Sequence, residues 1–306
     1  MAIVLNWNGR EETLHCLTSL RMQTEPPTIV VVDNGSTDGT PDAVRAAFPE
    51  TTVIETGANL GYAAGNNVGM RHALASGAEY VFVLNNDVTT EADCVERLVE
   101  ACAHQADIAA VAPKSLGAAP ANRIHFAGGS ISGRGETHHI GLGRPDGPAF
   151  DAPCDTEWLT GCAVLFPRSA LETIGLFDER FFLLFEDADW SLRARRAGLR
   201  LRYCPTARVR HIGSVAFGGK ASSSYQYYLS RNHLLWLEKH CPAPLRWRLA
   251  VHSLANSWRR AARLAESPED RRRLRYATAI GAGHYFLRRF GAGPFSKAKM
   301  NTHVSS

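Results

Sequence analysis

Short apolar runs alternate with helical patterns over the first half of the chain. The apolar runs are rich in β-branched residues and predict strands at residues 2–7, 28–33, 52–55, 80–85 and 108–112. Helical patterns lie between them, near residues 10–22, 41–48, 62–76 and 91–104. Thr40 followed by Pro41 is typical of a helix start. Alternation of this kind predicts an α/β fold with a mostly parallel sheet and right-handed crossovers.

The second half has a less regular pattern. Residues 114–156 are rich in Gly, Pro, Ala and His, and they predict loops with short strands near 123–126 and 138–140. The elements expected after this stretch are a strand at 158–166, a helix from Ser169, a strand-like run before Glu186, a strand over 199–204 and a helix over 224–240. The chain contains no internal repeat or low-complexity segment.

The composition is that of an ordinary soluble protein. At 306 residues and 45% hydrophobic content, the chain fits one large domain or two closely joined ones. No apolar run approaches the roughly 20 residues of a membrane span, and the N-terminus has no signal-peptide pattern, so we expect a cytoplasmic protein. The seven cysteines include no CxxC pair, which favours reduced, mostly buried thiols over a disulfide framework or a zinc site.

Positive charge is concentrated near the C-terminus. The formal net charge is only +4, but residues 246–289 contain eleven arginines and three acidic residues. The apolar residues Trp247, Val251, Leu254 and Trp258 recur there at near-helical spacing. Such a basic amphipathic helix either lies on an anionic membrane surface or packs against the body of the protein with its basic face in water.

Polar residues end two of the predicted strands. Asn85, Asn86 and Asp87 follow an apolar strand, and this places hard oxygen ligands at the carboxyl edge of the sheet, where open α/β folds bind ligands. Asp33 ends the second strand, and its carboxylate can accept the imide N–H of uracil or thymine. The alternative for both positions is an ordinary turn, in which Asn and Asp are common.

Two further segments carry candidate chemistry. Residues 57–69 combine Gly and Asn where a helix begins, so that backbone groups can approach a polar ligand closely. The segment FEDADW brings Glu186, Asp187 and Asp189 within four residues. Carboxylates are favourable at a helix start, which accounts for one of the three. A general base for a weakly nucleophilic hydroxyl is the functional interpretation of the others.

Six segments in this order resemble the inverting family-2 glycosyltransferases of GT-A fold, in the rhamnosyltransferase-like branch. They are IVLNWNG, VVVDNGSTDGT, NLGYAAGNNVGM, VFVLNND, LTGCAVLFPRSALETIGLFDERFFLLFEDADWSLRARRAG and HIGS, and they cover roughly residues 1–235. The resemblance implies a Rossmann-like, mostly parallel sheet flanked by helices. It also implies a GT-A catalytic domain over 1–240, with a nucleotide-binding half at 1–105 and an acceptor-binding half at 106–240. A basic helical extension follows at 241–306.

The resemblance implies roles for individual residues. The donor nucleotide would contact Asn6, Asp33, Asn34, Asn59, Gly61, Asn66, Asn85 and Asn86; the metal would be held by Asp87 and His211; and the acceptor would meet Trp158, Thr160, Gly161 and Glu186. Asp187 would be the catalytic base. Asn85 stands where the family has the first Asp of its DXD motif, so one carboxylate fewer reaches the ion.

Alternatives remain at several of these positions. Trp158 on a strand suits the core as well as a sugar face, and His211 suits a solvated surface. Arg231 and Asn232 are further candidates for a diphosphate or acceptor contact. The implied cofactor is Mn²⁺ or Mg²⁺.

The resemblance also implies substrates and partners. The donor would be a dTDP- or UDP-linked hexose, with dTDP-rhamnose suggested by analogy, and the acceptor a glycan or lipid-linked sugar in cell-surface polysaccharide synthesis. We expect docking on the cytoplasmic membrane face and no nucleic-acid partner. Two other classes stay open: a non-catalytic nucleotide-sugar or glycan-binding module of the same fold, and a sugar-nucleotide pyrophosphorylase. The segment NWNGREE after the first strand lacks the basic glycine-rich loop of the latter.

Overall fold

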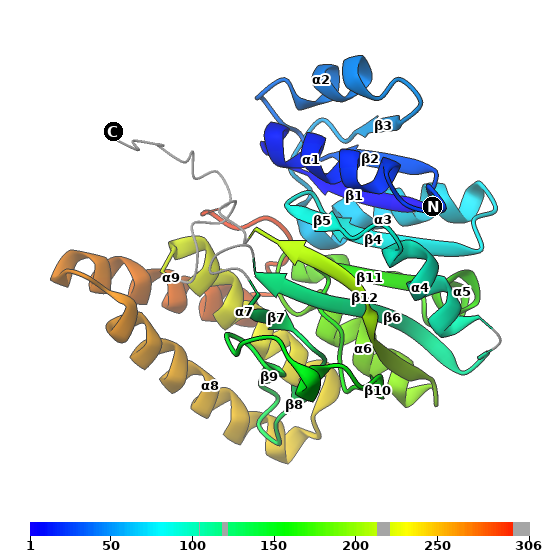
Figure 1. Cartoon of the computed structure of the whole chain (residues 1–306). Coiled ribbons are helices and arrows are strands. Elements are labelled where there is room, and N and C mark those ends of the chain that lie inside the picture. Colours follow the sequence, from blue (N-terminus) through cyan, green and yellow to red (C-terminus); the bar gives the residue numbers. More distant parts are fainter. Residues whose placement is uncertain (104, 118–121, 213–220, 296–306) are drawn as a thin grey trace. The chain divides into compact units, whose positions relative to one another are not determined.

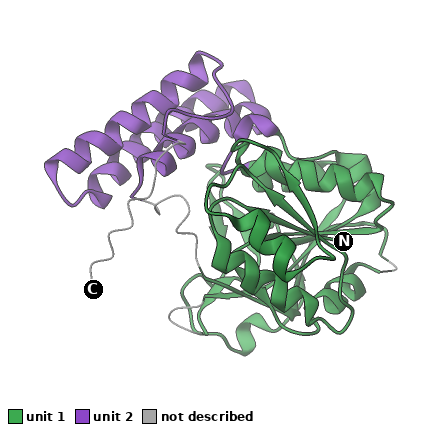
Figure 2. Cartoon of the chain, turned by 90° about the horizontal axis from the view of Figure 1, so that it is seen from above, with its two compact units in different colours: residues 1–178, 186–213 green, residues 179–185, 214–306 purple. Residues whose placement is uncertain are grey.

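The computed structural model describes residues 1–103, 105–117, 122–212 and 221–295. These residues form two compact units (Figure 2). The first contains Met1–Asp178 and Glu186–Gly213, and the second contains Glu179–Phe185 and Ser214–Ser306. Helix α7 therefore belongs to the same unit as the C-terminal helices. The functional division predicted at residue 240 stays a prediction.

A ten-stranded mixed sheet forms the centre of the first unit (Figure 1). Its main path runs β10-β12-β6-β11-β4-β1-β2-β3. The bounds are β1 Ala2–Asn6, β2 Ile29–Asp33, β3 Thr52–Glu55, β4 Tyr80–Asn85, β6 Ile108–Gly117, β10 Cys154–Asp155, β11 Ala163–Pro167 and β12 Arg200–His211. Strands β4, β1, β2 and β3 are parallel neighbours, whereas β11 runs antiparallel to both β4 and β6. The predicted mostly parallel sheet is confirmed.

Alternate residues of the strands face opposite helical layers. Ala2, Val4 and Val31 lie in a buried cluster with side chains of α1 (Arg10–Arg21), α2 (Thr40–Ala47) and α4 (Cys94–Cys102). Ile3 and Leu5 face α3 (Gly61–Ala75), where a Cβ at Gly69 or Gly65 would meet them at 2.2 and 2.6 Å. The two-residue period of a strand explains this division.

The irregular stretch extends the sheet with small pieces. Strand β5 (Val88–Thr90) pairs with the end of β12, and β7 (Ile124–Phe126) pairs with β6. Strands β8 (Gly129–Ile131) and β9 (Thr137–His139) form a separate hairpin. Helices α5 (Arg168–Ile174) and α6 (Glu186–Arg196) complete the unit. All seven cysteines are unpaired, and five are buried, as expected.

Two predicted strands are wrong in part. The strand expected at 158–166 begins only at Ala163, because backbone N–H groups before it bond to side chains of α6: Leu159 to Ser191 and Gly161 to Asp187. The run before Glu186 is no strand either. It contains a short 3₁₀ helix over Glu179–Phe181 and positive φ angles at Phe182, Leu184 and Phe185.

The second unit is built on three helices, α7 (Ser223–His240), α8 (Ala243–Leu264) and α9 (Pro268–Phe286). Ser222 and Ser267 begin α7 and α9, since each side-chain hydroxyl accepts a backbone N–H of the first turn. Trp247, Val251 and Trp258 of α8 are exposed. No helix within the described ranges is both long and apolar enough to cross a membrane.

Candidate active site at the carboxyl edge of the sheet

The sheet register brings most of the predicted polar residues to one edge. Asn6 at the end of β1 lies opposite Asp33 at the end of β2, and Leu5 lies opposite Asn85 of β4. Because β11 runs the other way, its beginning lies at the same edge, with Ala163 opposite Leu84. The ends of β1, β2 and β4 therefore lie at the same edge of the sheet as the segment that precedes β11.

Asp33 is held by a local network. One carboxylate oxygen accepts from Asn6 Nδ2 at 2.8 Å, and the other accepts from the backbone N–H of Ser36 at 2.9 Å. Asn6 Nδ2 also donates to Ser36 Oγ at 2.9 Å. Each carboxylate oxygen has a second lone pair, so the network fixes the carboxylate without exhausting its capacity to accept.

Asn34 shapes the loop that begins α3. Its Nδ2 donates to Asn59 Oδ1 at 3.2 Å and to Gly61 O at 3.1 Å, and its Oδ1 accepts from Leu60 N. Asn59 Oδ1 also accepts from Gly61 N at 2.8 Å. Gly61 has a φ of +83°, which suits glycine. Asn66 is buried and donates to Tyr62 O, while its Oδ1 has no hydrogen-bond partner in the described part of the chain.

Asn86 binds the protein rather than facing outward. Its Nδ2 lies within hydrogen-bond distance of Asn6 Oδ1, Thr13 Oγ1 and Gly9 O, at 3.1, 3.1 and 3.3 Å. These bonds join the end of β4 to β1 and α1. The hydrogens of this nitrogen are already used in these bonds. The structure therefore does not favour this nitrogen for the nucleotide contact that the resemblance implied for Asn86.

Asp87 and His211, separated by more than a hundred residues, lie side by side. The short pairing of β5 with β12 sets Val88 opposite His211, and Ile212 N donates to Asp87 O at 3.0 Å. His211 Nε2 lies 3.2 Å from Asp87 Oδ2. Both side chains are nearly buried, and neither His211 Nε2 nor Asp87 Oδ1 has a hydrogen-bond partner among the described residues.

This pair fits a divalent cation. Adjacent ligands of an octahedral ion with bonds near 2.1 Å lie about 3 Å apart, close to the observed 3.2 Å. Burial opposes protonation of His211, whereas Cys162 and Asp87 raise its pKa to about 11.

Glu186 and Asp187 begin α6 as adjacent carboxyl groups, of which Glu186 is buried and Asp187 is partly buried. Asp187 Oδ2 accepts from Gly161 N at 2.9 Å, and its Oδ1 accepts from Ala188 N at 2.7 Å. Burial raises the pKa of Asp187, and these hydrogen bonds oppose the increase. Burial, with the nearby charge of Asp187, raises the pKa of Glu186 well above its usual range. The raised pKa favours the protonated form of Glu186.

Tyr62 is a site residue that the sequence did not indicate. Its hydroxyl donates to Gly161 O at 2.5 Å, so Gly161 is fixed by Tyr62 on one side and Asp187 on the other. A Cβ at position 161 would lie 2.7 Å from the Tyr62 hydroxyl oxygen. Thr160 Oγ1 accepts from Cys162 N at 3.4 Å in the same loop. A tyrosine directly after a helix-initiating glycine carries no recognisable signal for this contact.

Comparison with known proteins assigns the chain to a family. The model for "Glycosyl transferase family 2" matches residues 1–136. The N-acetylglucosaminyl-diphospho-decaprenol L-rhamnosyltransferase of Mycobacterium tuberculosis is 31% identical over 257 residues, which cover 76% of this chain and 83% of that protein. The chain belongs to glycosyltransferase family 2. It is an enzyme of this class, as the resemblance implied.

Two further comparisons show proteins that this glycosyltransferase resembles in sequence or in fold. The dTDP-rhamnosyl transferase RfbF of Shigella flexneri is 24% identical over 269 residues, or 84% of this chain and 86% of that protein. The crystal structure of GalNAc-T7 with UDP, GalNAc and Mn²⁺ has a TM-score of 0.60 at 14% identity, covering 94% of this chain and 55% of that one. The predicted GT-A fold is confirmed.

Two residues of the glycosyltransferase, Trp158 and Asp189, are buried and lie outside the exposed part of the site. Trp158 is only 4% exposed; it packs edge-on against Phe126 and His139, and its Nε1 donates to His138 O at 3.3 Å. This packing is that of a core residue, which is one of the two positions that the sequence left open for Trp158. Asp189 is buried and pairs with Arg193 at 2.9 Å, so its role is structural.

Arg231 and Asn232 are not available to bind a diphosphate. Both are completely buried within the second unit. Arg231 donates to the carbonyl groups of Arg180 and Phe181, and Asn232 donates to those of Phe181, Leu183 and Leu184. They hold the left-handed segment that directly precedes Glu186 in the chain. The interpretation of these two residues as substrate contacts is wrong, because their donors serve the backbone.

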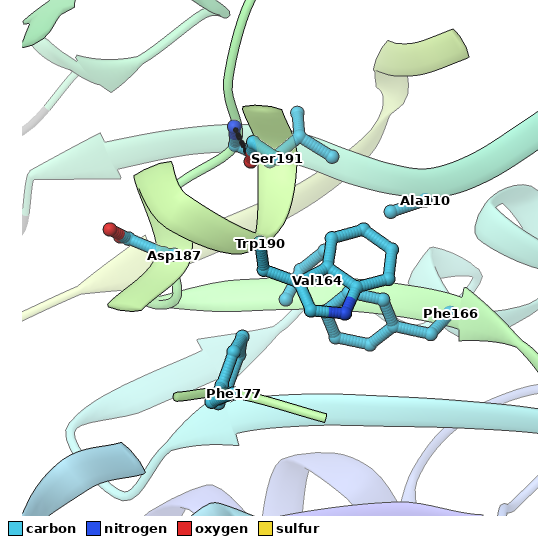
Figure 3. A pocket seen from close by; sticks show the side chains of 8 residues that line it. Ala110, Val164, Phe166, Phe177, Asp187, Trp190 and Ser191 are labelled. Carbon is cyan, nitrogen blue, oxygen red and sulfur yellow. Dashed lines mark hydrogen bonds between the residues drawn. The ribbon is translucent and has the colours of Figure 1, made fainter. Parts of the chain in front are cut away.

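A small apolar pocket lies behind Asp187. It is lined mainly by Leu159, Val164, Phe166, Phe177 and Trp190. Figure 3 shows the carboxylate of Asp187 pointing away from the rings of Phe166, Phe177 and Trp190. These rings pack closely, with 4.7 Å between the centroids of Phe166 and Trp190. The packed rings thus support α6, and the carboxylate of Asp187 points away from them.

Proposed function

We propose that this glycosyltransferase moves a hexose from a dTDP- or UDP-linked donor to a hydroxyl group of a glycan or lipid-linked acceptor, with inversion at the anomeric carbon. The loop of Gly161 and Cys162 carries the proposal. Gly161 N–H donates to Asp187, and Cys162 Sγ lies within 4.8 Å of a ligand atom of His211. Two consecutive residues thus lie next to the proton acceptor and next to the metal-binding pair.

The donor side consists of the residues at the ends of β1, β2 and β4. The fixed carboxylate of Asp33 would accept the imide N–H of a pyrimidine base, with Asn6 keeping it oriented. Asn34, Asn59, Gly61 and Asn66 would shape the pocket for the rest of the nucleotide, and Asn85 would reach ribose or phosphate. The dTDP-rhamnosyl transferase relative supports dTDP-rhamnose as the first donor to test.

Asp87 and His211 would hold Mn²⁺ or Mg²⁺. The GalNAc-T7 structure, which contains Mn²⁺ with UDP, supports a divalent ion, and the imidazole ligand favours Mn²⁺. A bound ion supplies positive charge to the departing diphosphate. Within this chain, Asp87 provides one carboxylate, so the ion would depend on diphosphate oxygens and water for most of its coordination.

The acceptor side depends on the paired carboxyl groups. The acceptor hydroxyl attacks the anomeric carbon as Asp187 takes its proton, and the bond to the nucleoside diphosphate breaks. The N–H groups of Gly161 and Ala188 keep Asp187 ionised and oriented. Glu186, which retains its proton, would donate a hydrogen bond to the acceptor next to Thr160. One in-line displacement inverts the anomeric configuration.

The proposed acceptor rests on a relative, and the proposed cellular location rests on the C-terminal region. The mycobacterial relative is named for N-acetylglucosaminyl-diphospho-decaprenol, which supports a lipid-linked acceptor in cell-surface polysaccharide synthesis. The exposed Trp247 and Val251 among arginines would bind α8 to the cytoplasmic membrane face, and the division into a catalytic domain over 1–240 and an extension over 241–306 is part of the proposal. The family assignment favours this transferase over a binding module or a pyrophosphorylase.

Calorimetry with nucleoside diphosphates and Mn²⁺ tests the donor site. We expect dTDP or UDP to bind and GDP and ADP to bind at least about tenfold more weakly, since an unpaired buried polar group costs about 1–3 kcal/mol. Asp87→Ala should abolish metal-dependent binding, and His211→Ala should weaken it, whereas Asp42→Ala, an exposed carboxylate on α2, should change nothing. Equal affinity for GDP, or full transfer activity in EDTA, would contradict the proposal.

A further inference from the structure

His211 of the Asp87–His211 pair also belongs to a second cluster, whose other two side chains, His125 and Cys162, the transfer mechanism does not use. His125 comes from β7, Cys162 directly precedes β11, and His211 ends β12. One potential ligand atom from each lies within 4.8 Å of the other two. Within the described ranges of the chain, this is the group of three or more His, Cys, Asp or Glu residues whose ligand atoms lie close enough together to hold an ion.

The distance between the two histidines matches tetrahedral coordination. His211 Nδ1 and His125 Nε2 are 3.4 Å apart. Two nitrogen ligands of a tetrahedral zinc ion, with bonds of 2.0–2.1 Å, lie about 3.3 Å apart. The other nitrogen of His211, Nε2, faces Asp87 at 3.2 Å. Each ring nitrogen of His211 thus faces a different potential ligand.

Neighbouring groups orient the cluster. His125 Nδ1 lies 3.4 Å from Ser115 Oγ, which leaves its Nε2 facing His211. His139 Nδ1 lies 2.9 Å from the backbone carbonyl oxygen of His125. Cys162 is 5% exposed and His211 is 7% exposed. Metal-binding histidines usually have their second nitrogen fixed in this way, and the burial limits solvent access to a bound ion.

We propose that His125, Cys162 and His211 form a second metal site, selective for Zn²⁺ or a similar thiophilic ion, that shares His211 with the Asp87 pair. Two imidazoles and a thiolate suit zinc, whereas Mg²⁺ and Mn²⁺ prefer oxygen ligands. The cluster leaves a fourth position for water. Binding releases the thiol proton of Cys162 to solvent.

The shared histidine has a consequence for catalysis. An ion bound to His211 Nδ1 leaves the remaining ring proton on Nε2, the nitrogen that faces Asp87, so Asp87 loses His211 as a partner for Mn²⁺. Zn²⁺ therefore inhibits transfer in competition with Mn²⁺, and cysteine substitution removes the inhibition. This consequence rests on the proposed function of Asp87 and His211, whereas zinc binding itself does not.

The binding experiment uses the metal-free full chain, first with Co²⁺ and then with Zn²⁺. Co²⁺ should give a near-ultraviolet sulfur-to-metal absorption band and the intense visible bands of a tetrahedral site. A chromophoric chelator in competition should report the zinc affinity. Cys162→Ser should remove the sulfur band and weaken zinc binding by at least about tenfold, and His125→Gln should weaken it similarly while keeping the sulfur band.

Two controls separate this site from the catalytic metal pair. Cys204→Ser removes a cysteine that is also 5% exposed but lies outside the cluster, and it should bind Zn²⁺ like the wild type. Asp87→Asn should reduce Mn²⁺ binding and keep the sulfur-to-Co²⁺ band, because the thiolate and both imidazoles of the cluster remain. Absence of the sulfur band, or wild-type zinc affinity in Cys162→Ser with an unchanged circular dichroism spectrum, would overturn the proposal. The His125–His211 contact would then be a hydrogen bond only.

Discussion

The backbone N–H of Gly161 donates to the carboxylate of Asp187 at 2.9 Å. The carbonyl group of the same residue accepts from the Tyr62 hydroxyl at 2.5 Å. A helix start, a loop before β11 and the first turn of α6 are joined through one glycine. The orientation of Asp187 therefore depends on a residue that has no side chain.

Gly161→Ala should disturb this arrangement. The new Cβ would lie 2.7 Å from the Tyr62 oxygen and 3.0 Å from a ring carbon, so the ring or the loop must move. Misplacement of a catalytic group by about 1 Å can cost 10²-fold in rate, and we expect kcat to fall by roughly that factor. Steady-state kinetics with the donor checks it. Gly133→Ala, where a Cβ meets open space, is the control; equal kcat values for the two variants would refute the role of Gly161.

Glu186 makes stability depend on pH. Its pKa in the folded protein lies well above the usual 4.5. In the range between the unfolded and the folded pKa, the unfolded state loses the proton and the folded state keeps it, so stability falls as pH rises. The slope is at most about 1.4 kcal/mol per pH unit.

Glu186→Gln should remove that dependence. Urea unfolding at a series of pH values should show the variant gaining stability relative to the wild type from about pH 4.5 upward, with no gain below it. Glu172→Gln, on the exposed side of α5 in an ion pair with Arg168, is a matched substitution. Parallel pH profiles for wild type and Glu186→Gln would show that Glu186 is not held protonated.

The exposed apolar residues of α8 should contribute to binding of anionic lipid. Trp247→Ala combined with Val251→Ala should weaken association with vesicles of anionic phospholipid roughly tenfold or more, because burial of one such side chain contributes about 1.5–3 kcal/mol. Binding should also weaken as salt is added. Vesicle co-sedimentation measures both effects.

The control for lipid binding is Phe286→Ala combined with Leu287→Ala. Both side chains are exposed at the end of α9, outside the arginine-flanked face of α8. If the α8 and α9 variants bind alike, or if neutral vesicles bind as well as anionic ones, α8 serves packing or oligomer contacts instead.

Much of the fold is predictable from the sequence because the strands are short runs of Val, Ile and Leu between clear helix starts. β1, β2 and β4 fall within one residue of their predicted bounds. The three residues of β5 are too few to show a periodic pattern, so the sequence does not predict this strand. Its pairing with β12 nevertheless sets Asp87 beside His211. The first part of the strand expected at 158–166 is absent because backbone donors there bind Ser191 and Asp187, which only the tertiary structure brings near.

The candidate site is predictable in its residue types and less so in its arrangement. Asp33, Asp87 and Asp187 stand out because carboxylates follow apolar runs. Asn86 follows the same pattern, but its amide nitrogen bonds to β1 and α1. Tyr62 and His125 were missed, because each reaches the site through contacts with residues 86 or more positions away. Such contacts leave no local signal in a single sequence.

The central claim is that Asp187 is the base of a single, inverting displacement, and turnover of Asp187→Asn tests it most directly. The loss of a general base typically costs about 10² to 10⁴ in rate. For Asp187→Asn we expect a loss of this size in kcat with unchanged nucleotide affinity. The control Asp189→Asn, which loses the ion pair with Arg193, should lower stability more than rate. Near wild-type turnover of Asp187→Asn would contradict the account.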